Sequence, residues 1–266
     1  MEKKTTVIVS GAAGKMGSLI IQLALEQKEN FTVKAGIEHK NHLLIGKVNQ
    51  FGIPIFDTIE GVVEDKDVVI DFSMPEITIK NLKICVDKKV PFVTGVTGFD
   101  SGQISLLKDA SLTIPVFFAP NMSIGVNLFF EIIKFSAGLL KDYDVEISEI
   151  HHNLKKDAPS GTAKKIADII SYALKRDSQK VLKYGREGLT GARTVEEIGM
   201  HSLRLGDIVG EHSVYFGGKG EVIELSHRCY NREAFASGAL KAASFISNKP
   251  AGFYSMEHLI EEAINV

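Results

Sequence analysis

The 266-residue sequence predicts an α/β protein in which a doubly wound parallel sheet precedes a smaller α+β domain with a mixed sheet. Three observations support this prediction. Short β-branched runs alternate with helical patterns as far as Pro120, a glycine-rich turn joins the first run to the first helix, and the alternation stops after Asn121. Because parallel strands need a crossover between them, usually a helix, we expect the first part to be a Rossmann-type sheet.

The elements expected in the first part follow one another without a break. Strands are predicted at 5–10, 31–38, 67–73, 90–95 and 114–120. Three helices are predicted in this part. One follows the glycine turn, one begins at Pro75, which suits a first helical position, and one lies near 100–110.

The pattern changes in the second part. A helix is predicted at 123–140, a strand at 143–152, a helix at 160–175, and strands at 200–205, 212–217 and 221–227. The last three strands have no helices between them, so we expect antiparallel or mixed pairing. A helix resumes at Glu233 and a shorter one ends the chain. These patterns predict two domains, 1–122 and 123–232, with 233–266 packing back on the first and hinges near 121–123 and 231–233.

The composition is ordinary for a soluble globular protein, with 44% hydrophobic and 24% charged residues. A net charge of -2 provides no basic field for nucleic acid or an anionic membrane. Cys85 and Cys229 form no CxxC pair, which favours free thiols in a reducing compartment. The longest apolar run contains Glu131 and the N-terminus lacks a long apolar stretch, so neither a spanning segment nor a signal peptide is expected. We therefore expect a cytoplasmic protein.

The glycine turn "VIVSGAAGKMG" places Gly11, Gly14 and Gly17 between the first strand and the first helix. Glycine allows a tight turn and lets the backbone approach a pyrophosphate at the helix N-terminus. Glu38 ends the second strand, where a ribose-binding carboxylate belongs. A merely tight turn is the alternative, but the context favours dinucleotide binding. No GK[ST] follows, which excludes a P-loop.

Charges near Glu38 leave the choice of nicotinamide cofactor open. A carboxylate there suits the ribose hydroxyls of NADH and repels the 2′-phosphate of NADPH. His39, Lys40 and Lys15 are cations that could bind that phosphate, or they are simply solvated. The sequence therefore predicts NADH binding and allows NADPH binding.

Three more loops follow predicted strands: "DFSMPE" (71–76), "GVTG" (95–98) and "APNMS" (119–123). Each could be an ordinary turn. In a doubly wound sheet, ligands bind beyond the carboxyl ends of the strands. Together these loops would line the nicotinamide half of the crevice.

The stretch "EIHHNLKKDAPSGTA" (149–163) gathers proton-exchanging groups beside a predicted helix end. His151 and His152 are adjacent on a strand and point to opposite faces, so no metal site is expected. One histidine could be a core residue, and the lysines could be solvated. Alternatively, Ser160 or Thr162 caps the helix, and its free N–H groups, with Lys155 and a histidine, attract a carboxylate. That arrangement suits the reduction of a carboxylated substrate by hydride.

These motifs, with "GREGLTGAR" (185–193) and "GDIVGEH" (206–212), resemble the 4-hydroxy-tetrahydrodipicolinate (dihydrodipicolinate) reductase family over nearly the whole chain. The resemblance implies a first domain that binds NADH or NADPH and a second that binds the substrate and forms a homotetramer. It implies that the cofactor is bound by Gly11, Gly14, Lys15, Met16, Gly17, Glu38, Phe72, Gly95, Thr97, Ala119, Asn121 and Met122. Many relatives have arginine where Lys15 and His39 stand, so the cofactor preference stays open.

The resemblance also implies the chemistry. His151 would be the catalytic proton donor or acceptor, with Lys155 as a second donor. His152, Ser160, Gly161 and Thr162 would bind the substrate carboxylates with Lys155. Hydride transfer with loss of the 4-hydroxyl as water would give tetrahydrodipicolinate, in the diaminopimelate route to lysine.

Three alternatives compete with this function. Another Rossmann-fold dehydrogenase should lack the HHxxKxDxPSGTA pattern. A nucleotide-sensing regulator would need a DNA-binding element or a basic face, and neither is found. A relative with a drifted substrate would keep His151 and Lys155, as this chain does.

Overall fold

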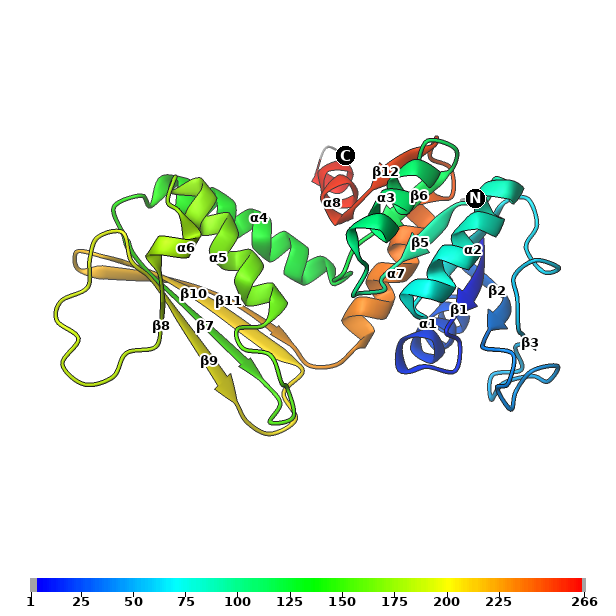
Figure 1. Cartoon of the computed structure of the whole chain (residues 1–266), viewed down its shortest axis with the longest axis horizontal. Coiled ribbons are helices and arrows are strands. Elements are labelled where there is room, and N and C mark those ends of the chain that lie inside the picture. The colour runs from blue at the N-terminus through cyan, green and yellow to red at the C-terminus, as the bar shows by residue number, and fades with distance from the viewer. Residues whose placement is uncertain (1–3, 265–266) are drawn as a thin grey trace. The chain divides into compact units, whose positions relative to one another are not determined.

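The computed structural model describes residues 4–264 and divides the chain into two compact units. One unit contains the chain up to Asn127 and again from Arg232, and the other is Leu128–Asn231. Each unit has a sheet of its own, seven-stranded in the first and five-stranded in the second (Figure 1).

The first unit is a doubly wound parallel sheet, as predicted. Its strand order is β12-β6-β5-β4-β1-β2-β3, and every neighbouring pair is parallel. The strands are β1 (Thr5–Ser10), β2 (Phe31–Ile37), β3 (Ile55–Phe56), β4 (Asp67–Asp71), β5 (Phe92–Thr94), β6 (Pro115–Phe118) and β12 (Gly252–Tyr254). The order reverses between β1 and β4, which is where a doubly wound sheet binds its ligand.

Helices cover both faces of this sheet. They are α1 (Lys15–Glu26), α2 (Pro75–Lys88), α3 (Ser101–Ala110), α7 (Glu233–Ile246) and α8 (Met256–Ile264). Successive β1 side chains enter opposite cores: Val7 and Val9 join the cluster with α1 and α7, and Ile8 joins the cluster with α2 and α3. Alternation of buried side chains on both faces explains why these strands read as continuous apolar runs.

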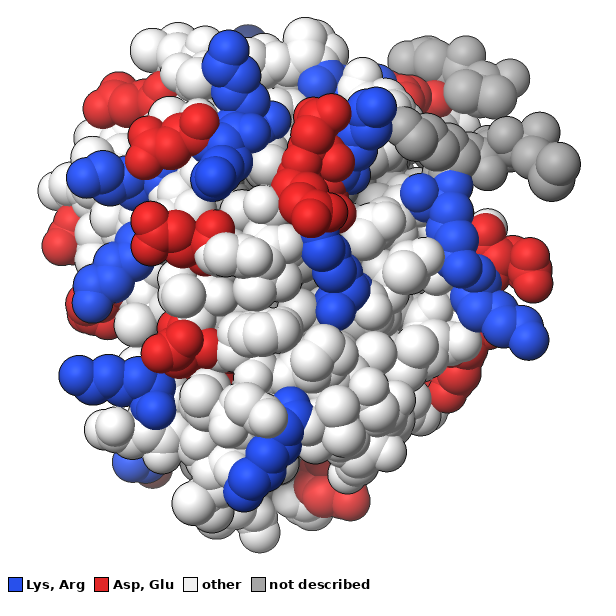
Figure 2. Space-filling model, turned by 90° about the vertical axis from the view of Figure 1, so that its right-hand side faces the viewer, with Lys and Arg blue, Asp and Glu red and all other residues white. Residues whose placement is uncertain are grey.

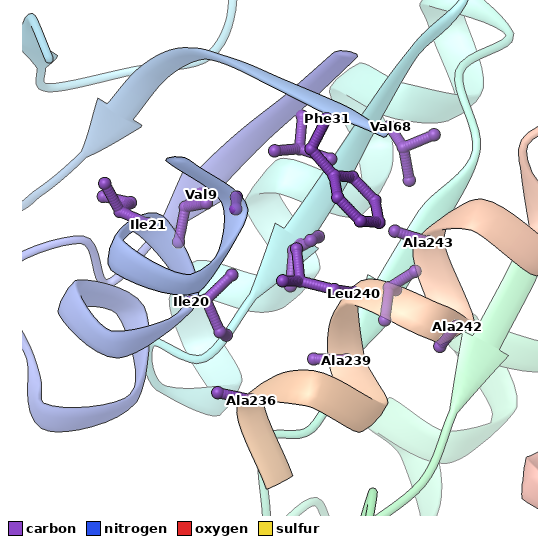
Figure 3. Close-up of a cluster of buried hydrophobic side chains, with 14 of the residues drawn as sticks. Val9, Ile20, Ile21, Phe31, Val68, Ala236, Ala239, Leu240, Ala242 and Ala243 are labelled. Carbon is purple, nitrogen blue, oxygen red and sulfur yellow. The ribbon is translucent and has the colours of Figure 1, made fainter. Parts of the chain in front are cut away.

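Alanines on α7 allow this helix to lie close to the sheet and to α1. Ala236 and Ala239 are fully buried beside Ile20 of α1, and Ala243, further along α7, is fully buried near Phe31 (Figure 3). Gly238 on the same helix approaches the main chain, since a Cβ there would lie 1.7 Å from the Met122 carbonyl oxygen. The helix that resumes after Asn231 thus supports the loop that follows β6.

The second unit has a mixed sheet of order β11-β10-β7-β9-β8, as predicted. Strand β10 is antiparallel to β7 and β11, whereas β9 is parallel to β7 and β8. The elements are α4 (Ile124–Leu139), which begins before the unit boundary, β7 (Asp144–His151), α5 (Gly161–Ala173), α6 (Ser178–Val181), β8 (Leu182–Tyr184), β9 (Ile198–Arg204), β10 (Gly210–Gly218) and β11 (Glu221–Cys229).

One face of this second sheet changes from apolar to polar along its strands. Side chains of β7 alternate, and Val145, Ile147, Glu149 and His151 are the buried ones. The paired strands continue the pattern, with Ile198 opposite Val145 and Arg204 opposite His151. The apolar end forms core, and the polar end lies under the N-terminus of α5.

The described residues contain no helix that is both long and apolar enough to cross a membrane. On the face drawn in Figure 2, lysine and arginine side chains are interspersed with aspartate and glutamate, and the described residues there form no continuous basic surface.

Candidate active site

The glycine turn forms an open helix N-terminus in the first unit. Gly14 is the N-cap of α1, no side chain caps the helix, and no acidic residue lies in its first turn. Gly11 has a φ of +76°, and a Cβ on Gly17 would lie 2.1 Å from the Gly11 carbonyl oxygen. Since the first N–H groups of a helix have no intrahelical acceptor, this turn suits an anionic diphosphate.

Glu38 lies at this turn, directly after β2. Its Oε1 accepts a hydrogen bond from the Ala13 N–H at 2.7 Å. The structure therefore brings the predicted ribose-binding carboxylate and the glycine turn together. Lys15, at the start of α1, and His39 and Lys40, which follow Glu38 in the sequence, are all exposed. Met16 is partly buried against the core.

The loop after β4 lies beside the glycine turn. The Phe72 N–H donates to the Ser10 carbonyl at 3.1 Å, and the Phe72 ring covers Gly95, where a Cβ would lie 2.3 Å from the ring. Asp71 stabilises this loop by hydrogen bonds. It is fully buried and accepts from the Ser73 N–H at 2.8 Å and from the Asn81 side chain at 2.9 Å. Burial raises the pKa of Asp71, and the bonds from Ser73 and Asn81 oppose this rise.

The remaining predicted cofactor residues differ in accessibility. Thr97 is exposed and Asn121 is half-buried, with its Oδ1 accepting from the Ser123 N–H at 2.9 Å. Ala119 and Met122 are buried, and the Met122 side chain belongs to the core cluster. A contact between Met122 and a ligand would therefore involve its backbone.

The histidine–lysine loop of the second unit joins β7 to α5. Ser160 is the N-cap of α5, and its hydroxyl accepts from the Ala163 N–H at 3.2 Å. Gly161 is exposed and Thr162 is half-buried in the first turn. The peptide bond between Ala158 and Pro159 is cis.

Lys155 lies in this loop, after the two histidines in the sequence and before the helix. Its Nζ forms an ion pair with Asp157 at 2.8 Å, and its N–H donates to the His152 carbonyl at 3.1 Å. His151 is buried and His152 is half-buried. The predicted catalytic and substrate-binding residues thus all lie within one unit, around one helix N-terminus.

A polar network lies beneath this loop. The Glu149 side chain is completely buried, and both of its oxygens accept from Arg204, at 3.0 and 2.8 Å. Glu149 also contacts His151 Nδ1 and accepts from the Ser160 N–H at 3.3 Å. The Ser160 hydroxyl lies 3.1 Å from His212 Nε2.

Sequence reasoning assigned no role to Glu149, Arg204 or His212. Alternation along β7 was the available signal for Glu149, since it places that residue on the face of His151. Arg204 and His212 come from β9 and β10, and only the strand pairing brings them to this site.

Burial dominates the electrostatics of the network. It lowers the pKa of His151, with Lys155 and Arg204 acting in the same direction and Glu149 opposing them. Burial alone would raise the pKa of Glu149, but hydrogen bonds from Arg204 and its neighbours outweigh that effect and lower it. Burial lowers the pKa of His212 to about 3. The site therefore holds an ionised carboxylate beside two neutral imidazoles at neutral pH.

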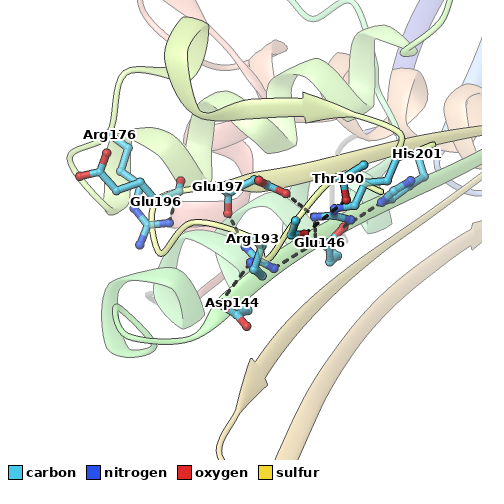
Figure 4. A network of polar contacts seen from close by, with 10 residues as sticks. Asp144, Glu146, Arg176, Thr190, Arg193, Glu196, Glu197 and His201 are labelled. Atoms are coloured by element: carbon cyan, nitrogen blue, oxygen red, sulfur yellow. Dashed lines mark hydrogen bonds and ion pairs between the residues drawn. The ribbon is translucent and has the colours of Figure 1, made fainter. Parts of the chain in front are cut away.

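The opposite face of the same sheet carries a second cluster of charges. Glu146 accepts from Arg186 at 2.7 Å and from Arg193 at 3.0 Å, and lies 2.8 Å from His201 Nε2 (Figure 4). A Cβ on Gly199 would lie 1.8 Å from this carboxylate. The cluster ties the "GREGLTGAR" loop to β7 and is separate from the histidine–lysine loop.

Among residues 4–264, no group of three or more histidine, cysteine, aspartate or glutamate side chains is placed to hold a metal ion.

Two family models match almost the whole chain. The model described as "Dihydrodipicolinate reductase, N-terminus" matches residues 5–122, and "Dihydrodipicolinate reductase, C-terminus" matches 125–260. A curated protein from Geobacter sulfurreducens named 4-hydroxy-tetrahydrodipicolinate reductase is 45% identical over 264 residues, covering 96% of this chain and 98% of that protein. A protein of the same name from Geobacter metallireducens is 45% identical over 262 residues, with the same coverage.

Solved structures agree with these matches. A dihydrodipicolinate reductase from Paenisporosarcina sp. TG-14, solved with dipicolinate bound, has a TM-score of 0.74 at 28% identity, covering 95% of this chain and 98% of that one. A probable dehydrogenase from Thermotoga maritima has a TM-score of 0.60 at 11% identity, covering 96% and 92%, which is a likeness of fold alone.

Proposed function

The chain belongs to the dihydrodipicolinate reductase family, and from that premise we propose that its loop from His151 to Thr162 binds the substrate dicarboxylate and handles the protons of its reduction. The reaction converts 4-hydroxy-tetrahydrodipicolinate, NAD(P)H and a proton into tetrahydrodipicolinate, NAD(P)⁺ and water, in the diaminopimelate route to lysine. The confirmed predictions are the family, the fold class, the reductase activity and the nicotinamide cofactor.

The first unit would hold the cofactor, which supplies a hydride when bound. The residues fit a dinucleotide, since the N-terminus of α1 is uncapped and Glu38 lies against the glycine turn. The diphosphate would lie on Gly11, Gly14, Lys15, Met16 and Gly17, with Glu38 on the adenosine ribose. Phe72, Gly95, Thr97, Ala119, Asn121 and Met122 would line the rest of the site.

The second unit would hold the substrate. The N–H groups of Gly161 and Thr162, the Ser160 cap and the His152 side chain would bind the carboxylates at the positive end of α5. Lys155 would supply a proton and His151 would give or accept one as the substrate is reduced and its hydroxyl leaves as water. The observation that carries this proposal is that one short loop holds His151 and Lys155 and leads into a helix with no acidic residue in its first turn.

The test is NADH or NADPH oxidation, followed at 340 nm, with substrate made in situ from pyruvate and aspartate semialdehyde by the preceding synthase. We expect rapid oxidation by the wild type and a loss of kcat/KM of about a hundredfold or more in Lys155→Ala. Lys156→Ala is the matched control, because Lys156 is exposed in the same loop, and it should keep its activity. Equal activity in both variants would refute the role of Lys155.

We also propose that the enzyme is a cytoplasmic homotetramer that assembles through the second sheet. The face of that sheet turned away from α5 leaves Leu203 and Val222 exposed, at 44% and 65% of their surface. Cys85 is a buried free thiol, which suits a reducing compartment. Light scattering on the purified protein would give the oligomeric state, and a monomer would refute the assembly.

A further inference from the structure

The Glu149 carboxylate contacts the His151 ring at Nδ1. Arg204 donates to both oxygens of Glu149 and the Ser160 N–H donates to Oε1, so several donors favour the ionised form of the buried carboxylate. An ionised carboxylate only accepts hydrogen bonds. The His151 Nδ1 that touches it must therefore carry the hydrogen, which leaves the lone pair of the neutral ring on Nε2.

We propose that Glu149 and Arg204 are positioning residues for the reduction: they fix His151 with its hydrogen on Nδ1, so that Nε2 is the atom that exchanges a proton at the substrate. This inference rests on the function proposed above and adds the atom and the residues that orient it. Neither Glu149 nor Arg204 needs to touch the substrate for this role.

The surroundings of Nε2 support the assignment. The neighbouring residue on β10 is Gly210, and a Cβ there would lie 3.1 Å from Nε2. Glycine therefore keeps that nitrogen clear of a side chain. The His151 side chain also retains 11% of its exposed surface, although the residue lies in the sheet.

Arg204 couples this arrangement to the loop that carries Lys155. Its Nη2 donates to the Asp157 carbonyl at 2.7 Å as well as to Glu149. The Arg204 guanidinium thus binds two groups. One is the Glu149 carboxylate beside His151, and the other is the backbone of Asp157, two residues beyond Lys155. This shared contact links the positions of His151 and Lys155, the two groups proposed to exchange protons with the substrate.

Four ionisable groups face His151. They are Glu149 on the same strand, Arg204 on β9, His212 on β10 and Lys155 in the loop. The ring centroids of His151 and His212 are 5.2 Å apart. Glu149 favours the charged imidazole, whereas Lys155 and Arg204 disfavour it. Removal of the Glu149 charge should therefore lower the pKa of His151, and removal of the Arg204 charge should raise it. A residue that only maintains the fold would not produce that pattern.

The experiment is a pH titration of the wild type and two variants labelled with ¹⁵N-histidine, followed by two-dimensional NMR that resolves the imidazole tautomers. In the wild type, neutral His151 should carry its hydrogen on Nδ1. The midpoint of its titration should fall in Glu149→Gln and rise in Arg204→Gln. Glu146→Gln is the matched control, because Glu146 contacts His201 and two arginines on the opposite face of β7, and it should leave the His151 signals unchanged.

Kinetics complete the test. Both variants should lose kcat by about tenfold or more, with NADH affinity unchanged, and the acidic limb of the pH–rate profile should move with the NMR midpoint. An Nε2–H tautomer in the wild type would overturn the inference even if neither variant folds. The inference would also be overturned if Glu149→Gln and Arg204→Gln fold but the midpoint of the His151 titration does not move in either. The NMR titration needs no turnover, so a failed reductase assignment would show separately, as a wild type that oxidises no cofactor.

Discussion

Glu38 and Glu149 are two carboxylates whose roles differ because their surroundings differ. Glu38 is half-buried at the edge of the glycine turn, and one of its oxygens is bound by the Ala13 N–H. Glu149 is completely buried and surrounded by donors. The first carboxylate is accessible to a ligand, and the second can act only through its neighbours.

Glu38→Ala should weaken NADH binding by about tenfold, because the ribose hydroxyls lose a charged acceptor. NADPH should be affected less, since removing the carboxylate also removes its repulsion of the 2′-phosphate. Fluorescence titration of each cofactor measures this. Glu29→Ala, which changes an exposed carboxylate on the same unit, is the control, and an equal effect of both substitutions on NADH would contradict the role of Glu38.

At the scale of single elements, the N-terminus of α5 is stabilised by one hydroxyl. Ser160→Ala should lower the free energy of unfolding by about 1 kcal/mol, because the Ala163 N–H loses its acceptor. Urea denaturation measures the change. Ser105→Ala, at an exposed serine of α3, should change stability by less than about 0.5 kcal/mol. Equal stability of Ser160→Ala and the wild type would mean that Ser160 is not an effective cap.

Most elements could be predicted because their patterns are long. The helix expected at 160–175 is α5, with Ser160 as its cap, and the strand expected at 143–152 is β7. Strands β3, β8 and β12 were missed, since runs of two or three residues show no periodicity. Strand β5 is as short, but it lies within the longer run 90–95 that predicted it. The short helix α6 was missed for the same reason.

The site could be predicted in part. Residues close in sequence, such as Lys155 and Ser160, were found together because one loop carries them. The partners of His151 were missed because register decides them: Arg204 faces His151 through the parallel pairing of β7 with β9. Pairing between strands so distant in sequence depends on the whole sheet and not on local pattern.

At the scale of the whole molecule, burial of His212 links folding to pH. Its ordinary pKa is 6.5 and burial lowers it to about 3, so the unfolded chain binds a proton between these values that the folded chain does not bind. Stability should therefore fall as the pH falls below about 6.5, by roughly 1.4 kcal/mol per pH unit for this one proton. The lowered pKa of His151 acts in the same direction.

Urea denaturation at pH 7 and at pH 5.5 tests this linkage. His212→Gln should lose less stability between the two pH values than the wild type, whereas His258→Gln, at an exposed histidine of α8, should behave as the wild type does. The same pH dependence in His212→Gln and the wild type would show that another group is responsible.

We propose the loop from His151 to Thr162 as the dicarboxylate site of this reductase. The most direct measurement is inhibition by dipicolinate, the ligand bound in the Paenisporosarcina enzyme, in the wild type, Lys155→Ala and Lys156→Ala. Competitive inhibition of the wild type, with an inhibition constant about tenfold or more higher in Lys155→Ala and unchanged in Lys156→Ala, is the predicted result. An inhibition constant that is the same in all three proteins would place the dicarboxylate elsewhere and contradict the account.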